Sequence, residues 1–496
     1  MAQDLARSID IPDVDHSSIH SLSNEVLSLI FVEACYDDYL TRLDHQPRTC
    51  TALSIGLVCG SWRQIMLSGA NDHCWASFIV SDADVIRQRN LIPLLMLYLE
   101  RSGVKPLHVK AYLEHCHEDS PILPLIMEHS SRWERVTLAV PSWTSLIFEE
   151  ARPLPRLVHV DFGFRDTRYL HIRLLCFSEA QNIRTLTLRN ICKANLIIPE
   201  SNQITQYTSE RSSIAGSLRN ADGMEDLEEL EFLSPYDSDE QSAGYNIIHP
   251  SLRLIRLTQE ANKDASPRYK SRDVLRQMIG GLTVPALQHL YIDLECWHTE
   301  PRALSAWNRK AVIWPHSEFL AFVQRSELRW TLEYLHLSNV NFTAQQLVDC
   351  LEALPGVREL DLDEPPGFES AVLVKWLTRY EALAEPWAAE CTREPCPRAP
   401  RLDYLGIGGK LDVRDDDLVM MVESRMEHSE MAAKWDESSR ERGEDEDVYT
   451  PELELMHVDF MFRYRVMDEE ARVRLYALNQ PDHPRFIRVS KDWDDS

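Results

Sequence analysis

The sequence predicts an α/β protein in which a small helical module at the N-terminus precedes an irregular solenoid of parallel strands. Two observations support this prediction. Apolar residues recur at helical spacing in two segments near the N-terminus, and one apolar pattern typical of a buried strand recurs through the rest of the chain. A length of 496 residues also exceeds what one ordinary core can serve, so we expect more than one structural unit.

The first helical segment is expected from Ser21 to Tyr36. Ser23 is in position to cap it, and Glu25 lies in the first turn, where a negative charge favours a helix. The apolar residues at helical spacing are Leu22, Val26, Leu27, Ile30 and Phe31.

The second helical segment is expected from Ala52 to Leu67 as one helix. Gly56 and Gly60 fall inside it, and each costs about 1 kcal/mol relative to alanine. We interpret these glycines as allowing another helix to cross this one closely. The apolar residues that face the predicted core are Leu53, Leu57, Val58, Trp62 and Ile65.

Beyond residue 105, the pattern apolar-x-x-apolar-x-apolar recurs. About one window in twelve matches it by chance at this apolar content, so only periodicity supports a prediction. Four of the intervals lie near 25 residues and three near twice that value, and leucine-rich repeats have periods of about 20–29 residues. We therefore predict a leucine-rich-repeat-like array with one strand per repeat; the alternative is a set of unrelated buried strands in an α/β domain. The triplets begin at Trp133, Leu157, Ile183, Leu227, Leu252, Leu287, Leu332, Val357, Leu402 and Leu455.

The clearest unit starts at Leu332. Its strand is followed by Thr343, which is placed to cap a helix over Ala344 to Ala353 with Leu347 and Leu351 on one face. Each repeat is therefore expected to join a strand to a helix.

Two stretches interrupt this pattern. Pro199 to Gly223 is rich in Ser, Thr and Gln and is expected to be a loop. Residues 412–447 form an acidic insertion with 14 acidic and 5 basic residues. Its first part, Asp417 to Trp435, is expected to be helical, and Asp436 to Asp447 to be a solvated loop.

These patterns predict four regions along the chain. They are a flexible lead at 1–18, a helical module at 19–80, a helical and strand connection at 81–130 and the repeat array at 131–496.

Composition excludes several kinds of partner. The 52 basic and 79 acidic residues give a formal charge of -27, which repels phosphate backbones, so we expect neither nucleic acid nor a membrane as partner. The apolar run from Leu91 to Leu99 is too short to span a bilayer, and Met1 to Asp15 does not resemble a signal peptide. The 11 cysteines form no Cys-x-x-Cys pair, which indicates reduced thiols and a cytoplasmic or nuclear location.

The candidates for chemistry are weak. Glu114 to Asp119 gathers metal-capable side chains but lacks a second separated pair, so a surface turn is the better interpretation. Gly406 to Gly409 lacks the Lys-Ser/Thr of a phosphate loop and is expected to be a tight turn. We predict no catalytic residues, no cofactor and no metal; an enzyme with a site in the α/β region is the least favoured alternative.

The N-terminal module resembles an F-box, in the form common in mushroom-forming fungi. The residues that carry the resemblance run from Ile19 to Phe31 and through the Val58-Cys59-x-x-Trp62-Arg63 pattern, followed by Trp75. The resemblance covers about 19–80. It departs from the family by having Ser23 in place of the usual proline and no proline between Pro47 and Trp75.

The resemblance implies a substrate-recognition subunit of an SCF-type ubiquitin ligase, which binds a Skp-family adaptor and, through it, a cullin and a RING protein. We assign Trp62 mainly to the core of the module and favour Leu22, Val26 and Val58 for contact. The alternatives are a scaffold that binds the adaptor without ubiquitinating a target, a repeat scaffold without a ligase role, and a module that merely caps the array. The complete predicted adaptor-binding set is Leu22, Val26, Leu27, Ile30, Leu57, Val58 and Trp62.

Target binding is expected on the exposed face of the predicted sheet. The residues between the apolar positions of each triplet would line it, including Tyr404, His457 and Asp459 late in the chain. Aromatic and His side chains are frequent at interface hot spots, and the acidic part would favour a basic partner segment. The predicted substrate-binding set is His289, Tyr291, Tyr334, His336, Glu359 and Asp361.

Overall fold

The structure is a computed structural model in which contacts divide the chain into two compact units. The first comprises Met1–Thr144 and Arg152–Val160, and the second comprises Ser145–Ala151 and Asp161–Ser496. The predicted lead at 1–18 lies outside the described residues. Those described are 19, 22–36, 38–39, 50–81, 91–165, 173–191, 195–235, 247–259, 274–294, 312–365, 367–378, 401–425, 457–462, 467–478 and 486–491.

Three short helices open the first unit. They are α1 (Asn24–Ala34), α2 (Thr51–Val58) and α3 (Gly60–Met66). The predicted cap is confirmed, because the side chain of Ser23 accepts a hydrogen bond from the Val26 N–H at 3.5 Å.

The single helix predicted from Ala52 to Leu67 is wrong, since the chain breaks at Cys59. This residue is extended (φ -157°, ψ 171°), and its Sγ accepts a hydrogen bond from the Trp62 N–H that starts α3. The predicted close helix crossing is also wrong: no atom lies within 4 Å of a Cβ built on Gly56 or Gly60.

A parallel sheet completes the first unit. Its strands follow the order β1, β2, β3, β4, and β3 lies inside the connection predicted at 81–130, so the sheet runs across residue 130. At the boundary between the units lie η4 (Ser142–Phe148) and β5 (His159–Phe164). The other elements of the first unit are β1 (Asp38–Tyr39), η2 (Gly69–Trp75), β2 (Ser77–Ser81), α5 (Leu91–Arg101), β3 (Leu107–Tyr112), α6 (Ile122–Glu128), η3 (Ser130–Arg132) and β4 (Trp133–Val140).

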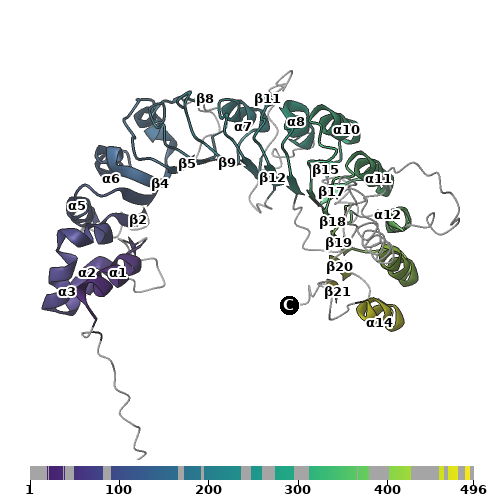
Figure 1. Cartoon of the computed structure of the whole chain (residues 1–496). Coiled ribbons are helices and arrows are strands. Elements are labelled where there is room, and N and C mark those ends of the chain that lie inside the picture. Colours follow the sequence, from purple (N-terminus) through teal and green to yellow (C-terminus); the bar gives the residue numbers. More distant parts are fainter. Residues whose placement is uncertain are drawn as a thin grey trace, which may run out of the picture. The chain divides into compact units, whose positions relative to one another are not determined.

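The second unit is built on a long parallel sheet whose helices lie on one face (Figure 1). Each strand pairs with the next in chain order. The strands are β7 (Thr185–Arg189), β9 (Gln206–Glu210), β10 (Glu229–Leu233), β12 (Leu254–Thr258), β14 (His289–Asp293), β16 (Tyr334–Ser338), β18 (Glu359–Asp363), β19 (Tyr404–Gly409), β20 (His457–Phe462) and β21 (Phe486–Lys491). The helices are α7 (Ile214–Ala221), α8 (Val274–Gly281), α10 (His316–Arg325), α11 (Ala344–Ala353), α12 (Ser370–Leu377) and α14 (Glu469–Ala477).

Three pairs of two-residue strands lie outside this sheet. They are β6 (Arg173–Leu174) with β8 (Asn195–Leu196), β11 (Ile247–Ile248) with β13 (Leu282–Thr283), and β15 (Val312–Ile313) with β17 (Val340–Asn341). Within the described ranges, no helix has the length and apolar character needed to cross a bilayer.

The register of the long sheet explains the apolar triplets. The middle residue of each triplet pairs with its equivalent in the next strand, as in Leu335 with Leu360, so equivalent side chains stack in one buried row. Strand residues alternate between the two faces, and the residues between the apolar ones therefore form rows on the opposite face. The capped helix after Leu332 is confirmed as well, with a capping box formed by Thr343 and Gln346.

Two predictions about interruptions need correction. Pro199 to Gly223 is not a loop, because it contains β9 and α7. The glycines from Gly406 to Gly409 lie inside β19 rather than in a turn. In β9 the third apolar position is Ser209, which is buried and satisfied by Ser217, with 2.5 Å between the two hydroxyl oxygens.

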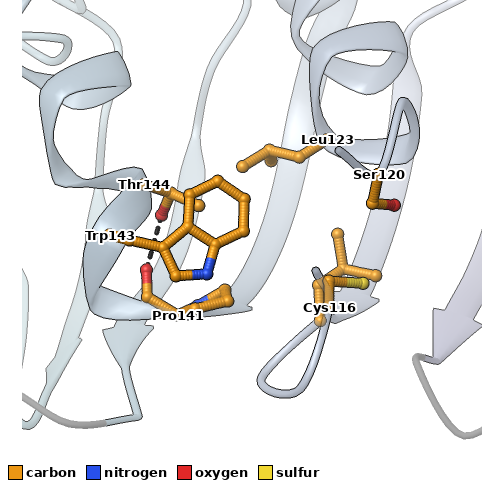
Figure 2. Close-up of a pocket in the computed structure, with 7 residues that line it drawn as sticks. Cys116, Ser120, Leu123, Pro141, Trp143 and Thr144 are labelled. Atoms are coloured by element: carbon orange, nitrogen blue, oxygen red, sulfur yellow. Dashed lines mark hydrogen bonds between the residues drawn. The ribbon is translucent and has the colours of Figure 1, made fainter. Parts of the chain in front are cut away.

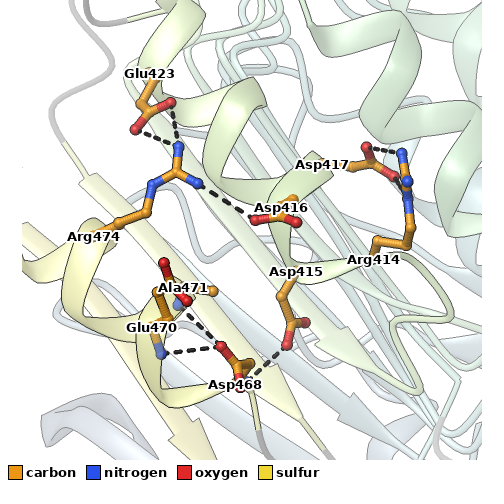
Figure 3. Close-up of polar contacts among 9 residues, drawn as sticks. All are labelled: Arg414, Asp415, Asp416, Asp417, Glu423, Asp468, Glu470, Ala471 and Arg474. Atoms are coloured by element: carbon orange, nitrogen blue, oxygen red, sulfur yellow. Dashed lines mark hydrogen bonds and ion pairs between the residues drawn. The ribbon is translucent and has the colours of Figure 1, made fainter.

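The acidic segment also begins as part of the packed structure. The predicted helix from Asp417 to Trp435 is confirmed for the residues described, since residues 415–425 are helical and bury Leu418 and Val422. Residues 426–447 lie outside the described residues. Arg474 on α14 donates to both carboxylate oxygens of Glu423 at 3.0 Å and joins α14 to this helix (Figure 3).

Candidate docking surfaces

Six large apolar side chains at or near α1 and α2 are exposed to solvent. They are between 39% and 74% exposed, which is unusual for such large apolar side chains in one small module, and we refer to them together as the apolar patch. On α1 they occupy one side, because residues three and four apart share a helix face. The apolar patch consists of Leu22, Val26, Leu29, Ile30, Leu57 and Val58.

The neighbouring side of α1 is the core of the module. Leu27 and Phe31 are 4% and 2% exposed, and the ring of Phe31 lies 4.8 Å from that of Trp62. Leu27 therefore offers almost no surface to a partner, and we reassign it from the predicted contact set to the core. Trp62 is half-buried.

A buried asparagine holds α1 against α3. The side-chain nitrogen of Asn71 donates to the Ser28 hydroxyl at 3.1 Å and to the Ile65 carbonyl at 2.7 Å. Asn71 is 1% exposed, so these hydrogen bonds fix the orientation of α1 from inside the module. The apolar patch is thus presented on a braced scaffold.

The second candidate surface lies on the helix-free face of the second unit, over β14 to β20. All six residues predicted for substrate binding lie on three adjacent strands of it, in the registers that pair β14 with β16 and β16 with β18. The ladder face, as we call it, consists of His289, Tyr291, Tyr334, His336, Glu359, Asp361, Tyr404, His457 and Asp459.

One row of the ladder face is a continuous stack. The Arg256 guanidinium lies 5.4 Å from the ring centroid of Tyr291, whose ring stacks on His336 at 4.1 Å with only 3° between the planes. His336 Nδ1 lies 2.9 Å from Asp361 Oδ2. Cation, ring, imidazole and carboxylate thus follow one another across four strands.

Gly406 leaves space for polar side chains at the acidic end of this row. A Cβ on Gly406 would lie 2.7 Å from Asp361 Oδ1 and 2.8 Å from the Tyr404 hydroxyl, so both groups use the space over β19 that a side chain would fill. On β20, the register places Asp459 beside Gly406. Two acidic strands therefore flank a strand whose middle position has no side chain.

Negative charge dominates this end of the ladder face. Burial, followed by the charges of Asp361 and other neighbours, raises the pKa of Tyr334 and of Tyr404 to about 12. Burial and then Asp361 raise the pKa of Asp459, while Arg488 and His457 act in the opposite direction. Oδ1 of Asp459 has no hydrogen-bond partner among the described residues.

At the other end of the sheet, acidic side chains are paired with an arginine. Arg189 donates to both oxygens of Asp161, at 2.7 and 2.8 Å, and lies 3.4 Å from Glu210. Within the described part of the chain, Glu359 has no ion-pair partner, whereas Asp459 lies in register with Arg488 on β21, whose charge lowers the pKa of Asp459. Sequence reasoning alone could not distinguish these two ends, because both alternate charged and apolar residues.

The structure offers little for catalysis at the sites that the sequence suggested. Residues 114–119 form turns, and within the described ranges no group of three or more His, Cys, Asp or Glu side chains could hold a metal ion. A hollow beside this turn, between Cys116 and Trp143, offers about 10 Å³, roughly the space of one water (Figure 2).

A Cys, His and Asp also meet between α10 and α11. Cys350 Sγ lies 3.9 Å from His316 Nδ1, and His316 Nε2 lies 3.2 Å from Asp349. The thiol is 1% exposed, and burial raises its pKa to about 12, whereas a nucleophilic cysteine needs a lowered pKa. Cys350 is therefore a packed side chain at the edge of a partly exposed His316–Asp349 pair.

No protein-family model matches the chain, and no curated protein is significantly similar to it in sequence.

Proposed function

We propose that this protein is a non-catalytic substrate receptor of an SCF-type ubiquitin ligase. The helices within 19–80 would act as an F-box and bind a Skp-family adaptor through the apolar patch. The second unit would be a leucine-rich-repeat solenoid that binds a target protein. Such a receptor acts by proximity, since it raises the concentration of a captured protein near the ligase.

The apolar patch is the observation that supports this proposal most directly. A module that served only to cap the sheet would turn its large apolar residues inward, whereas Leu57 and Val58 are 74% and 58% exposed. Its rigid bracing by Asn71 also suits docking, because a preorganised surface loses less entropy on binding. An amphipathic helix of an adaptor could cover the patch.

The decisive experiment measures binding of purified Skp-family adaptor to the full chain by calorimetry. We expect Leu22→Asp/Val58→Asp to weaken binding roughly a thousandfold, because two buried apolar anchors contribute about 2 kcal/mol each. The matched control, Val104→Asp/Leu146→Asp, adds the same charges at side chains 78% and 71% exposed elsewhere, and should bind like the wild type. Circular dichroism checks that each variant is folded.

Absence of adaptor binding by the wild type, or equal loss in both double variants, would overturn the proposal. A scaffold without a ligase role is the second candidate. Accumulation of a bound protein after loss of the gene separates the receptor from the scaffold, because only a receptor promotes degradation.

A further inference from the structure

The β16–β20 end of the ladder face combines carboxylates with aromatic rings. Glu359 lies in register between Tyr334 on β16 and Tyr404 on β19. The ring of His457 follows on β20, with its centroid 5.0 Å from that of Tyr404. Acceptors and ring faces are therefore available side by side on one exposed sheet surface.

We propose that this end of the ladder face binds an arginine side chain in a basic segment of the target protein. This inference names the target class of the proposed function and rests on it for its biological meaning. The binding itself needs no adaptor, so either proposal can fail alone.

The sheet already contains one example of the interaction. On β12, Arg256 lies over Tyr291 and also pairs with Glu231 on β10 at 3.3 Å. A guanidinium between a carboxylate and a ring is thus a stable arrangement on this surface. Tyr404 and Glu359 repeat the ring and the carboxylate at the other end, where no described cation is paired with Glu359.

The chemistry favours arginine over lysine. A guanidinium is planar, stacks on aromatic rings and donates two parallel hydrogen bonds to a carboxylate, whereas an ammonium group is a compact and strongly hydrated point charge. The rings of Tyr334 and Tyr404 are half-buried and held in place, so little conformational entropy is lost when a guanidinium packs on them.

The negative field at this end supports the same ligand. The pKa of Asp459 and of both tyrosines is raised in part by the charge of Asp361. An arriving cation would relieve this repulsion. An acidic partner segment would increase the repulsion.

The test uses fluorescein-labelled nona-arginine and nona-lysine with the full chain, measured by fluorescence anisotropy at 0.15 M salt. We expect nona-arginine to bind about fivefold more tightly than nona-lysine. Glu359→Gln/Asp459→Asn should weaken nona-arginine binding about tenfold. The matched control, Glu225→Gln/Asp226→Asn, removes two exposed acids from the turn before β10 and should stay within about twofold of the wild type.

A second pair of variants tests the rings. Tyr404→Leu should weaken nona-arginine binding about fivefold, while Tyr404→Phe, which keeps the ring, should stay within about twofold. Equal binding of the two peptides, or equal weakening by the control and the acidic-site variants, would overturn the proposal. Equal effects of Tyr404→Leu and Tyr404→Phe would do so as well.

Discussion

The packing of the turn before β18 against Trp330 predicts a strong and local effect of one methyl group at Gly356. This glycine lies in the turn before β18, where its N–H donates to the Arg329 carbonyl at 3.0 Å. A Cβ on Gly356 would lie 2.7 Å from Cα, 2.8 Å from C and 2.9 Å from O of Trp330. The closest separation is about 0.7 Å short of the 3.4 Å at which ordinary contact begins.

Backbone atoms cannot rotate away as the end of a side chain can, so the two turns must move apart. Overpacking of this kind costs about 1–3 kcal/mol. Alanine recovers about 0.4–1 kcal/mol by restricting the unfolded chain, which leaves a net destabilisation of about 1–2 kcal/mol for Gly356→Ala. The matched control is Gly280→Ala, because Gly280 lies in α8 with no atom within 4 Å of its Cβ position. That substitution should stabilise α8 by about 0.5–1 kcal/mol.

Hydrogen exchange followed by mass spectrometry measures both effects locally. Gly356→Ala should speed exchange in β16 and β18 about 5- to 30-fold, and Gly280→Ala should slow exchange in α8 about 2- to 5-fold. Unchanged exchange in β16 and β18 would refute the inference that these turns are in backbone contact. Equal acceleration throughout the chain would refute the inference that the damage stays local.

Two further predictions concern pH and the C-terminal helices. His249 is 2% exposed, and burial lowers its pKa from 6.5. As the pH falls, the unfolded state therefore takes up a proton before the folded state does. The contribution of His249 to the free energy of unfolding should be complete above about pH 6.5 and decrease as the pH drops below it. Urea denaturation between pH 5 and 8 should show this loss in the wild type and a shallower loss in His249→Phe, and identical slopes would contradict it. Arg474→Met should destabilise α14 by about 1 kcal/mol, because Arg474 links α14 to Glu423. The control Arg472→Met removes only the ion pair with Glu469 inside α14 and should cost about 0.3 kcal/mol. Exchange rates of α14 measure both, and equal effects would refute the link.

The apolar triplets predicted most strands of the second unit because their burial is local and periodic. The strand β9 was missed since Ser209 stands where an apolar residue is expected, and a serine in that position is tolerated only because Ser217 satisfies it from α7. The strand β21 was missed for a similar reason: Ile487 and Val489 fit the pattern, but Pro484 stands at the first position.

The break at Cys59 could not be read from the sequence. Cysteine is not among the usual capping residues, and the apolar spacing continues across it, so the pattern predicts one helix. Because of this break, α2 ends at Val58, and both Leu57 and Val58 of the apolar patch are exposed.

Sequence alternation identified which residues face outward on the sheet, but not which of their charges are satisfied. Arg189 and Asp161 are 28 residues apart and neutralise each other, while Glu359 lies between two tyrosines. The distinction depends on register across strands separated by irregular lengths of chain. It is this difference between the two ends that limits the candidate site to β16–β20.

The overall charge of the chain bears on its selectivity for arginine. A chain with a net charge of -27 attracts any polycation at long range, and an acidic patch alone would therefore give little selectivity. That attraction is screened over about 8 Å at physiological salt, whereas stacking of a guanidinium on Tyr404 depends on contact. Selectivity for arginine over lysine thus has to come from the rings, since both peptides carry the same charge. The comparison of Tyr404→Leu with Tyr404→Phe isolates that contribution, because neither substitution changes the net charge of the protein.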